Sequence, residues 1–461
     1  MDMRGEVATA EFGDKRLNAR LVRLAEQLAK APDQSFPKAA GSDAALEATY
    51  RFLGNEAVTP AAILQPHIAA TVARCAAAAV VFVAHDTTEF SFSTERDGIG
   101  RVAGDGTHGF LGHFALAVAA KGRAPLGVLG MEPFFRERGK RTGRQRRHQA
   151  MDDKESGRWL QLVQRVDEAV GGVASTVHVM DREADAYELL AGLSAGKHRF
   201  IVRLQFDRAA DTTIGRGRIS DVMKRSRTLL TRDVTLSARV PKQREPPSRG
   251  KKHPFRRTRS AKLSISASSV TIRRPAHLGS RVPETLRLNV VRVVEKNVRL
   301  GIDPVEWRLV TSESIDGPDD VAAVVDGYRA RWLIEEYFRA LKQGCAYEKR
   351  QLESKHALLN ALAVFIPIAW QLLALRQLSR DDEKLPASRI LSPLKLMLLQ
   401  RHRDVRLRPN ATIREAMFAI AALGGHITNN GDPGWLVLGR GYEDLLLLER
   451  GAALALGCDQ S

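Results

Sequence analysis

The spacing of hydrophobic residues changes along this chain, and its first part has a helical period. Apolar residues in the first 75 positions recur at intervals of three or four, as in FGDKRLNARLVRLAEQLAK. The leucines on that face are Leu17, Leu21, Leu24 and Leu28. A second helix is expected over 42–53, ending at Gly54, and a third after Thr59-Pro60, because Thr caps and Pro begins helices. Residues 1–75 are therefore predicted to form a helical domain.

Short apolar runs replace the helical period from residue 79. Residues 79–84 form a continuous apolar run, typical of a strand buried on both faces, and we expect it to stop at Asp86. Further strands are expected over 114–119, 125–131, 176–180 and 200–204, with helices over 155–170 and 183–193. This order predicts an α/β layer with a five-stranded mixed sheet.

Residues 208–310 resemble an insertion with a different period. Apolar residues alternate with polar ones around positions 234–240, 263–267 and 286–290, which predicts antiparallel strands with one wet face. Between them, residues 241–260 carry eight basic residues and one acid, typical of a solvated loop or of a DNA-backbone contact.

From residue 320 the pattern is helical again, including a capping box of Thr412 with Glu415 and a stop at Gly424-Gly425. Residues 357–375 are long and apolar enough for a membrane span, but Asn360, Pro367 and Gln371 favour a buried core helix. We expect no membrane association.

Composition narrows the class of protein. The 461 residues suggest two or three domains, and 71 Lys plus Arg against 53 Asp plus Glu give a formal charge of +18, which favours a polyanionic partner such as nucleic acid. Three cysteines without paired spacing argue against a disulfide framework or a thiolate zinc site and fit a reducing cytoplasm. The N-terminus has no apolar signal region.

Two acids follow buried strands, Asp86 in VFVAHDTTEF and Asp181 in VHVMDREADAY. Open α/β sheets bind ligands at this edge. The simpler interpretation is that each aspartate caps a helix or forms a turn, and either residue alone favours it.

A third acid lies in a polar stripe within DGYRARWLIEEYFRALKQG. At about 100° per residue, five side chains fall within about 60° of Tyr328 on an ideal helix. They are Tyr328, Arg331, Glu335, Arg339 and Lys342. An exposed face with i,i+4 ion pairs would explain the charges, but not the apolar residues around the rest of the circumference.

Three carboxylates from two strand ends and a helix can hold two Mg²⁺ ions. Such a pair, about 3.5–4 Å apart, stabilises both the attacking and the leaving oxygen in displacement at phosphorus. Arg and Lys beside it suit phosphate oxygens.

The chain resembles the IS-four (insertion-sequence-four) family of bacterial DDE transposases. Tyr-x2-Arg-x3-Glu-x6-Lys, from Tyr328 to Lys342, is similar to the family's YREK signature. FGDKRLNARLVRLAEQLAK, YRFLGN, DTT, KESGRW, DREAD, RFIVR and PGWLVLGRGY occur in the family's order, so that the resemblance covers nearly the whole chain.

The resemblance implies an α/β fold: an RNase H-like catalytic core with a β-rich insertion, flanked by helical domains. It implies Asp86, Asp181 and Glu335 as ligands of two Mg²⁺ ions, with Mn²⁺ as a substitute. The implied activity is cut-and-paste transposition by nicking, hairpin formation, hairpin opening and strand transfer. Tyr328, Arg331 and Lys342 would hold terminal phosphates and a displaced base, Trp307 would stack on that base, and Arg203 would bind phosphate. Arg339 stands where the family pattern has Lys.

These expectations divide the chain into four parts: a DNA-binding domain (1–75), the core (76–207 and 305–378), the insertion (208–304) and a dimerisation domain (379–461). The partners would be double-stranded DNA, as terminal inverted repeats and target, and a second copy of the chain, in a bacterial cytoplasm at the nucleoid.

Candidate contacts are weaker outside the core. Arg20, Lys30 and Arg51 are candidate DNA contacts by position. Val437-Leu438 and Leu445–Leu448 suggest an apolar dimer interface or, equally, a local core.

Two other functions stay open. One is a magnesium-dependent nuclease on the same core without strand transfer. The other is a catalytically defective, transposase-derived DNA-binding protein, against which the complete acid set argues.

Overall fold

The computed structural model describes residues 3–30, 32–102, 107–135, 157–212, 215–236, 258–298, 304–381, 385–389, 391–405, 407–427 and 432–455. The chain divides into two compact units. Unit 1 comprises residues 1–148, 161–176 and 330–461, and unit 2 comprises residues 149–160 and 177–329. Each unit has its own sheet strands and is described by itself.

Unit 1 begins with helices, as predicted. They are α1 (Arg4–Val7), α2 (Lys15–Lys30), α3 (Phe36–Ala40), α4 (Asp43–Leu53) and α5 (Pro60–Cys75). Ser42 and Thr59 cap α4 and α5 through their side chains, accepting from Ala45 N and Ala62 N at 3.3 and 3.2 Å. The predicted starts of these two helices are thus confirmed, whereas the short α1 and α3 carry too little periodicity to be predicted.

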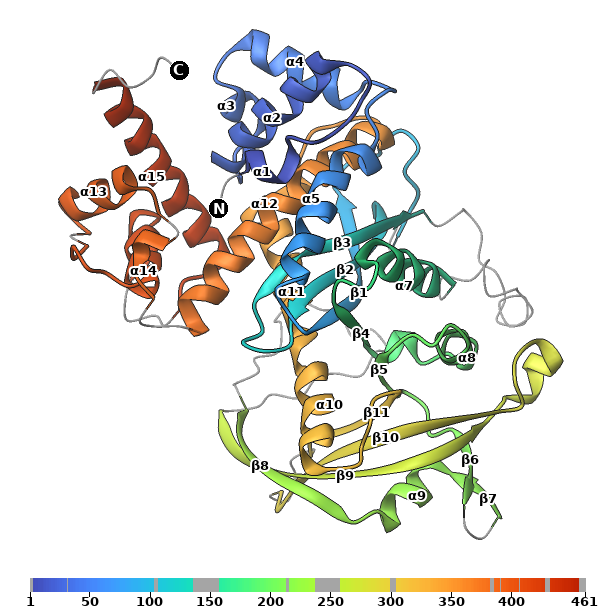
Figure 1. The fold of residues 1–461 in the computed structure, drawn as a ribbon. Coiled ribbons are helices and arrows are strands. Elements are labelled where there is room, and N and C mark those ends of the chain that lie inside the picture. The colour runs from blue at the N-terminus through green and yellow to red at the C-terminus, as the bar shows by residue number, and fades with distance from the viewer. Residues whose placement is uncertain are drawn as a thin grey trace. The chain divides into compact units, whose positions relative to one another are not determined.

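The strands of unit 1 form an antiparallel meander of β1 (Val80–Phe92), β2 (His108–Ala119) and β3 (Pro125–Phe134). Helix α7 (Gly157–Val170) and the end of α5 pack against it through one apolar cluster (Figure 1). This cluster includes Cys75, Val83, Ala115, Leu129 and Leu162. The prediction that β1 stops at Asp86 is wrong, because pairing with β2 continues to Phe92 opposite His108.

The rest of unit 1 is helical. Helix α11 (Trp332–Arg339) continues into a π-helical turn (Ala340–Gly344), a 3₁₀ turn (Tyr347–Lys349) and the long α12 (Lys355–Asp381). Helices α13 (Pro393–Arg401), α14 (Ile413–Leu423) and α15 (Trp435–Ala455) share a separate apolar cluster. The predicted Thr412–Glu415 capping box is present.

Among the described helices, α12 contains the segment Lys355–Gln377, which is long and apolar enough to cross a membrane. That segment's apolar window is 89% buried inside the protein. It packs against α5 and β3, where the Trp370 indole donates to the carbonyl of Pro125 at 3.0 Å (Figure 1). The interpretation of this segment as a buried core helix is therefore supported.

Unit 2 contains a parallel pair and a long antiparallel extension. Strand β4 (Ser175–Met180) pairs in parallel with β5 (Phe200–Arg203), and α8 (Tyr187–Ala195) connects the two strands along the chain. Strand β11 (Glu306–Thr311) pairs antiparallel with β5. The predicted insertion extends this layer with β10 (Thr285–Lys296) and β9 (Arg259–Arg273), which form a long hairpin (Figure 1). Strands β8 (Thr228–Leu236), β6 (Ala209–Thr212) and β7 (Gly215–Arg218), with α9 (Ile219–Arg225), complete the insertion.

The prediction of one wet face fits β10, where burial alternates from Thr285 to Val290, better than β9. In β9, Ser264 and Ser266 are buried along with Leu263 and Ile265, so that this part of the strand is covered on both faces. Helix α10 (Pro318–Ala330) ends the unit. Of the basic segment 241–260, all but the last three residues lie outside the described residues.

Candidate functional site

A buried arginine joins two of the three predicted carboxylates. Arg331 donates from Nη1 to Asp86 Oδ2 at 2.7 Å and from Nη2 to Glu335 Oε1 at 2.9 Å. The side chains of Arg331, Asp86 and Glu335 are 9%, 15% and 31% exposed. Asp86 and Glu335 are far apart in sequence, and this guanidinium brings their carboxylates into one site of unit 1.

Asp86 takes its place from the strand pairing of β1. It lies opposite Phe114 in β2, and its Oδ1 accepts a hydrogen bond from Thr87 N at 2.9 Å. Because β1 continues past it, Asp86 lies inside a paired strand rather than at a free strand end. The backbone around it is therefore fixed by ladder hydrogen bonds, which favours a defined carboxylate position.

The polar stripe is not carried by one ideal helix. Helix α10 ends at Ala330, α11 begins at Trp332, and residues 340–344 form a π-helical turn. The prediction that Tyr328 and Lys342 lie on one face of a single ideal helix is therefore wrong in detail. A π-helical turn holds an extra residue, which changes the direction of the side chains in and after it. The predicted apolar flank is correct: Leu333, Ile334, Tyr337 and Leu341 are buried.

Lys342 lies over the part of β1 that follows Asp86, at Glu89 and Phe90. Its Nζ donates to the carbonyl of Glu89, lies 3.5 Å from Glu348 Oε1 and is 5.4 Å from the centre of the Phe90 ring. Glu348 in turn accepts a hydrogen bond from Ser91 N at 2.9 Å. The ammonium is thus fixed beside the strand that carries Asp86.

Arg339 has a different environment. Its Nη1 donates to Glu336 Oε1 at 2.8 Å, and its side chain is 48% exposed. Glu336 also pairs with Arg376 at 3.3 Å and accepts from the Trp435 indole at 3.3 Å. Arg339 therefore belongs to a structural ion-pair cluster of α11, α12 and α15 as well as to the exposed side of α11.

A second group of predicted residues lies together within unit 2. The rings of Trp307 and Tyr328 meet edge to face at 5.3 Å, and Arg203 Nη1 lies 3.5 Å from the Tyr328 hydroxyl. Trp307 is half-buried and Tyr328 is 7% exposed. Pairing of Arg203 with Leu309 sets this arrangement, since Trp307 then lies on the same face of β11, two residues away.

Asp181 follows β4 directly, as predicted. Its Oδ1 accepts from Glu183 N at 2.8 Å and caps the 3₁₀ turn Arg182–Ala184. This contact is the one that the turn-forming interpretation predicts. Burial, and then the charge of Arg203, lower the pKa of the adjacent Arg182.

Two acids that the sequence argument did not single out organise the surroundings. Asp185, the last residue of DREAD, is buried and accepts from Gln205 N and Phe206 N at 2.7 and 2.8 Å, and pairs with Arg208. Glu348 holds Lys342. The DREAD motif includes Asp185 and could have indicated it as a functional residue. No local sequence pattern links Glu348 to Lys342.

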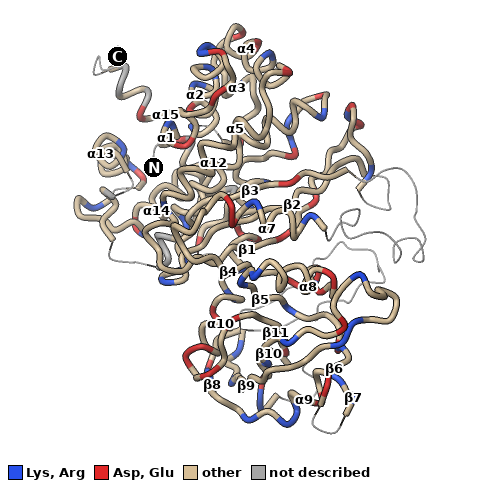
Figure 2. The backbone as a smooth tube through the Cα atoms, turned by 45° about the vertical axis from the view of Figure 1, so that its right-hand side comes forward, with Lys and Arg blue, Asp and Glu red and all other residues tan. Residues whose placement is uncertain are grey.

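The candidate contacts of the N-terminal helices lie on their solvent side. Arg51 is 72% exposed, with Glu47 at 3.6 Å, while Lys30 is exposed and Arg20 half-buried. Helix α2 carries further Lys and Arg positions, shown in blue in Figure 2. These positions leave the basic side chains accessible to a polyanion.

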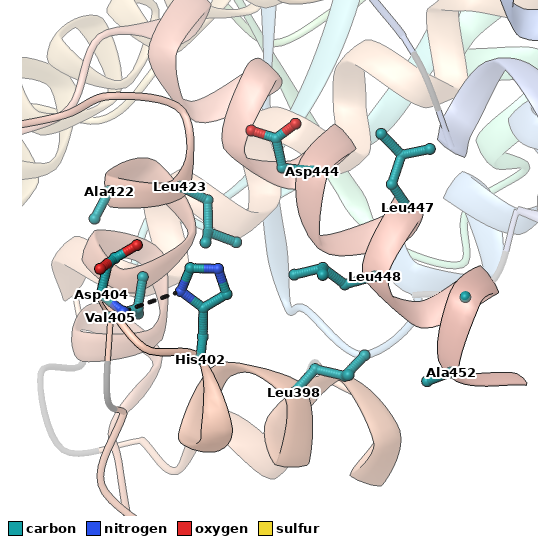
Figure 3. A pocket seen from close by; sticks show the side chains of 11 residues that line it. Leu398, His402, Asp404, Val405, Ala422, Leu423, Asp444, Leu447, Leu448 and Ala452 are labelled. Atoms are coloured by element: carbon teal, nitrogen blue, oxygen red, sulfur yellow. Dashed lines mark hydrogen bonds between the residues drawn. The ribbon is translucent and has the colours of Figure 1, made fainter. Parts of the chain in front are cut away.

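The C-terminal apolar residues divide between core and surface. Leu438, Leu445 and Leu446 are buried, whereas Leu447 and Leu448 are 56% and 36% exposed. Leu447 and Leu448 line a pocket between α13, α14 and α15, beside His402, whose Nδ1 accepts from Asp404 N at 3.3 Å (Figure 3). The local-core interpretation therefore holds for the first three, and an accessible apolar surface exists at the other two.

Residues 3–58 match the family model for transposase DNA-binding domains. The matched segment covers α1 to α4 and includes Arg20, Lys30 and Arg51. It gives the basic N-terminal helices a DNA partner and supports a relationship of the chain to transposases. The protein has a transposase-type DNA-binding domain.

Proposed function

We propose that this protein is a DNA transposase of the IS-four DDE type, which excises an insertion sequence and joins it to target DNA. The observation that supports this most is the contact of Arg331 with Asp86 and Glu335 at 2.7 and 2.9 Å. Two acids and a phosphate-binding cation of the expected motif thus share one site, on a chain with a transposase-type DNA-binding domain.

The arrangement within each unit is consistent with an RNase H-like core. Unit 1 supplies an antiparallel meander, β1 to β3, and unit 2 supplies a parallel β-α-β pair, β4 and β5, followed by the insertion and β11. This order of strands and helices along the chain is the one expected of such a core, and we propose that the chain contains one.

Asp86 and Glu335 also fit Mg²⁺ as ligands. Their oxygens converge on one guanidinium, so that they face a common cationic position, and hard carboxylate oxygens are what Mg²⁺ prefers. We propose that they hold two ions together with Asp181, and that Mn²⁺ can substitute. Bound there, the ions would activate the attacking oxygen and stabilise the leaving one.

The chain's own residues would bind and orient the DNA. Arg331 offers a planar fork of donors, and Lys342 an ammonium fixed over β1, both suited to phosphate oxygens. In unit 2 the half-buried Trp307, supported by Tyr328, offers a ring edge and face for an extruded base, and Arg203 a further phosphate contact.

We also propose that two copies act together on paired terminal repeats in a bacterial cytoplasm. The exposed Leu447 and Leu448 would contribute to the contact between copies. Apolar residues of this kind are commonly buried in permanent interfaces.

The test uses single substitutions of the acids. Asp86→Asn, Asp181→Asn and Glu335→Gln each remove a carboxylate charge but leave the N-terminal helices unchanged. Each variant should shift an end-containing duplex in a gel as the wild type does, yet fail to nick it with Mg²⁺ or Mn²⁺. Thr87→Val, beside Asp86, is a control that should keep nicking. Near wild-type nicking by any acid variant would remove that residue from the site.

Offering target DNA to pre-cut ends separates transposase from nuclease. Joined products would establish strand transfer, whereas nicking without joining would favour the nuclease. A wild-type chain that binds ends and never nicks them would favour a defective, DNA-binding derivative.

A further inference from the structure

Arg350 is a buried guanidinium between the N-terminal helices and the segment that carries Lys342. It is 2% exposed. It donates to the carbonyls of Pro32 and Gln34, in the connection between α2 and α3, and to that of Cys345 in its own segment. These contacts tie two parts of unit 1 that lie more than 300 residues apart in sequence.

The surroundings of Arg350 are unfavourable for a charged side chain. The rings of Phe36 and Phe365 lie 5.4 and 4.5 Å from the guanidinium, and the groups that it hydrogen-bonds are neutral carbonyls. Burial lowers its pKa to about 10. A charged group in such a place is costly, and an apolar residue of similar size would often be more favourable. What the guanidinium adds is direction, because its planar donors accept only a narrow range of partner positions.

Helix α12 holds the same N-terminal helices at a second place. Asn360 Nδ2 donates to the carbonyls of Leu53 and Val58, both at 2.9 Å, and is fully buried. One turn earlier, His356 donates from Nε2 to the carbonyl of Asn55 at 2.9 Å. The segment matched as DNA-binding, residues 3–58, is thus attached by directional hydrogen bonds at two places, the α2–α3 connection and the end of α4 with the residues that follow it.

The attachment is also continuous with the candidate site. Arg350 directly follows the 3₁₀ turn Tyr347–Lys349, which carries Glu348, the partner of Lys342. Ala346 precedes that turn with a left-handed backbone, φ +47°, which a non-glycine residue adopts only where its surroundings enforce it. One short segment therefore fixes both Lys342 and the N-terminal helices.

We propose that Arg350 is a positioning residue, which fixes the DNA-binding helices relative to the site of Asp86, Glu335 and Lys342. The proposal rests on the proposed function, because it assigns a consequence for cleavage. The protein sets the distance along the DNA between the bases bound by the N-terminal helices and the phosphate that is cut.

The first test measures the attachment without any reaction. Spin labels on Glu47→Cys in α4 and Glu168→Cys in α7, in a Cys458→Ser background, report the distance between the N-terminal helices and the core by pulsed electron resonance. The distribution should be narrow for the otherwise unchanged chain and clearly broader for Arg350→Met. Lys349→Met, which removes the exposed neighbouring cation, should leave it narrow.

The second test maps the nick at single-nucleotide resolution on an end-labelled duplex. Arg350→Met should bind the end about as well as wild type but spread its nicks over neighbouring phosphates, whereas a merely structural role would lower the amount of nicking at one unchanged position. Arg350→Lys, which keeps the charge but not the fork, should show the same spread to a lesser degree. Lys349→Met should nick at one phosphate.

A folded Arg350→Met protein with an unchanged label distribution, or with nicks at one phosphate, overturns the proposal. If Arg350→Met does not fold, Arg350→Lys decides by the same two measurements. If the wild type never nicks, the proposed function fails, and the spin-label distances still decide whether Arg350 fixes the helices.

Discussion

At the scale of single residues, Arg331 is central to the candidate site because it contacts two of its acids. Its guanidinium reaches Asp86, 245 positions earlier in the chain, and Glu335, one helical turn later. A cation between two carboxylates offsets their mutual repulsion. The same donors suit phosphate oxygens, so that Arg331 can serve the acids and the DNA at different times.

Trp307 carries the first prediction at this scale. Bending a nicked DNA end into a hairpin is easier once a base leaves the stack, and aromatic stacking contributes about 1–3 kcal/mol per base. Trp307→Ala should therefore slow hairpin formation by roughly five- to over a hundred-fold while leaving the first nick little changed. Denaturing gels of end-labelled DNA separate nicked, hairpin and fully cut products.

The control for this prediction keeps an aromatic ring. Trp307→Phe retains a stacking face beside Tyr328 and should restore much of the hairpin product. Equal losses of the first nick and of the hairpin in Trp307→Ala would contradict the base-stacking role.

His67 carries a second residue-scale prediction, on stability against pH. The ring is fully buried, with Nδ1 2.6 Å from Glu6 Oε2 and Nε2 accepting from Val128 N at 3.0 Å. An Nε2 that accepts is unprotonated, which agrees with a pKa lowered by burial. Burial opposes ionisation of Glu6 as well, but hydrogen bonds from His67 and Arg74 outweigh it and lower its pKa.

Both shifts have the same sign for stability. As pH falls, the unfolded chain binds a proton at His67 at about pH 6.5 and at Glu6 at about pH 4.3. The folded chain binds each proton at a lower pH. The free energy of unfolding should therefore decrease as pH falls below about 6.5, and further below about 4.3. Urea titrations should show that decrease for wild type and a flatter profile between pH 7 and 5 for His67→Gln. His402→Gln is the control, and an unchanged slope in His67→Gln would contradict the assignment.

At the scale of elements, the sequence predicted what depends on local pattern. Ser42, Thr59 and Thr412 cap helices at the expected positions, and the alternation around Leu286 and Leu288 marks a strand. These signals are local because a cap or a period-2 face involves residues only a few positions apart.

Long-range features were not predictable in this way. The continuation of β1 beyond Asp86 depends on pairing with β2, and the π-helical turn at Lys342 packs against α12 and α15, which are distant in sequence from β1. The hydrogen bonds of Arg350 to Pro32 and Gln34 join positions more than 300 residues apart. In the candidate site, the residue types were predictable from the motif, but the contact of Arg331 with Asp86 required the folded chain.

Two glycines of α15 give a prediction at the element scale. A Cβ on Gly441 would lie 1.7 Å from the carbonyl oxygen of Ile420 in α14, whereas a Cβ on Gly451 meets nothing within 4 Å. Gly451→Ala should stabilise the C-terminal helices by about 0.5–1 kcal/mol, because Ala favours a helix. Gly441→Ala should destabilise them by about 1–3 kcal/mol or more, since backbone must shift.

Thermal unfolding followed by circular dichroism checks both glycine substitutions. The two variants make the same chemical change on the same helix, so that opposite signs isolate the α14–α15 contact. Destabilisation of similar size in both would show instead that the contact contributes little.

At the scale of the whole molecule, charge is the dominant property. A formal charge of +18 gives the chain an attraction for DNA that is independent of sequence. Many arginines of the described residues are nevertheless in ion pairs, as Arg232 with Asp326 and Arg259 with Glu295. Net charge alone therefore does not identify the DNA-binding surface, and basic positions must be compared with one another.

The 241–260 segment allows that comparison, although most of it lies outside the described residues. Lys251, Lys252, Arg256 and Arg257 are close together in sequence, and each cation that contacts a phosphate adds about 0.9 to the slope of log affinity against log salt. Replacing all four with Gln should weaken binding to every duplex alike and reduce that slope by up to about 3.6, at four times 0.9. The control replaces four exposed arginines of the C-terminal part of the chain, Arg401, Arg403, Arg408 and Arg440, which changes the net charge equally. Filter-binding titrations across salt concentrations measure both. If the two variants lose the same slope, the attraction comes from total charge, and the segment makes no DNA contact of its own.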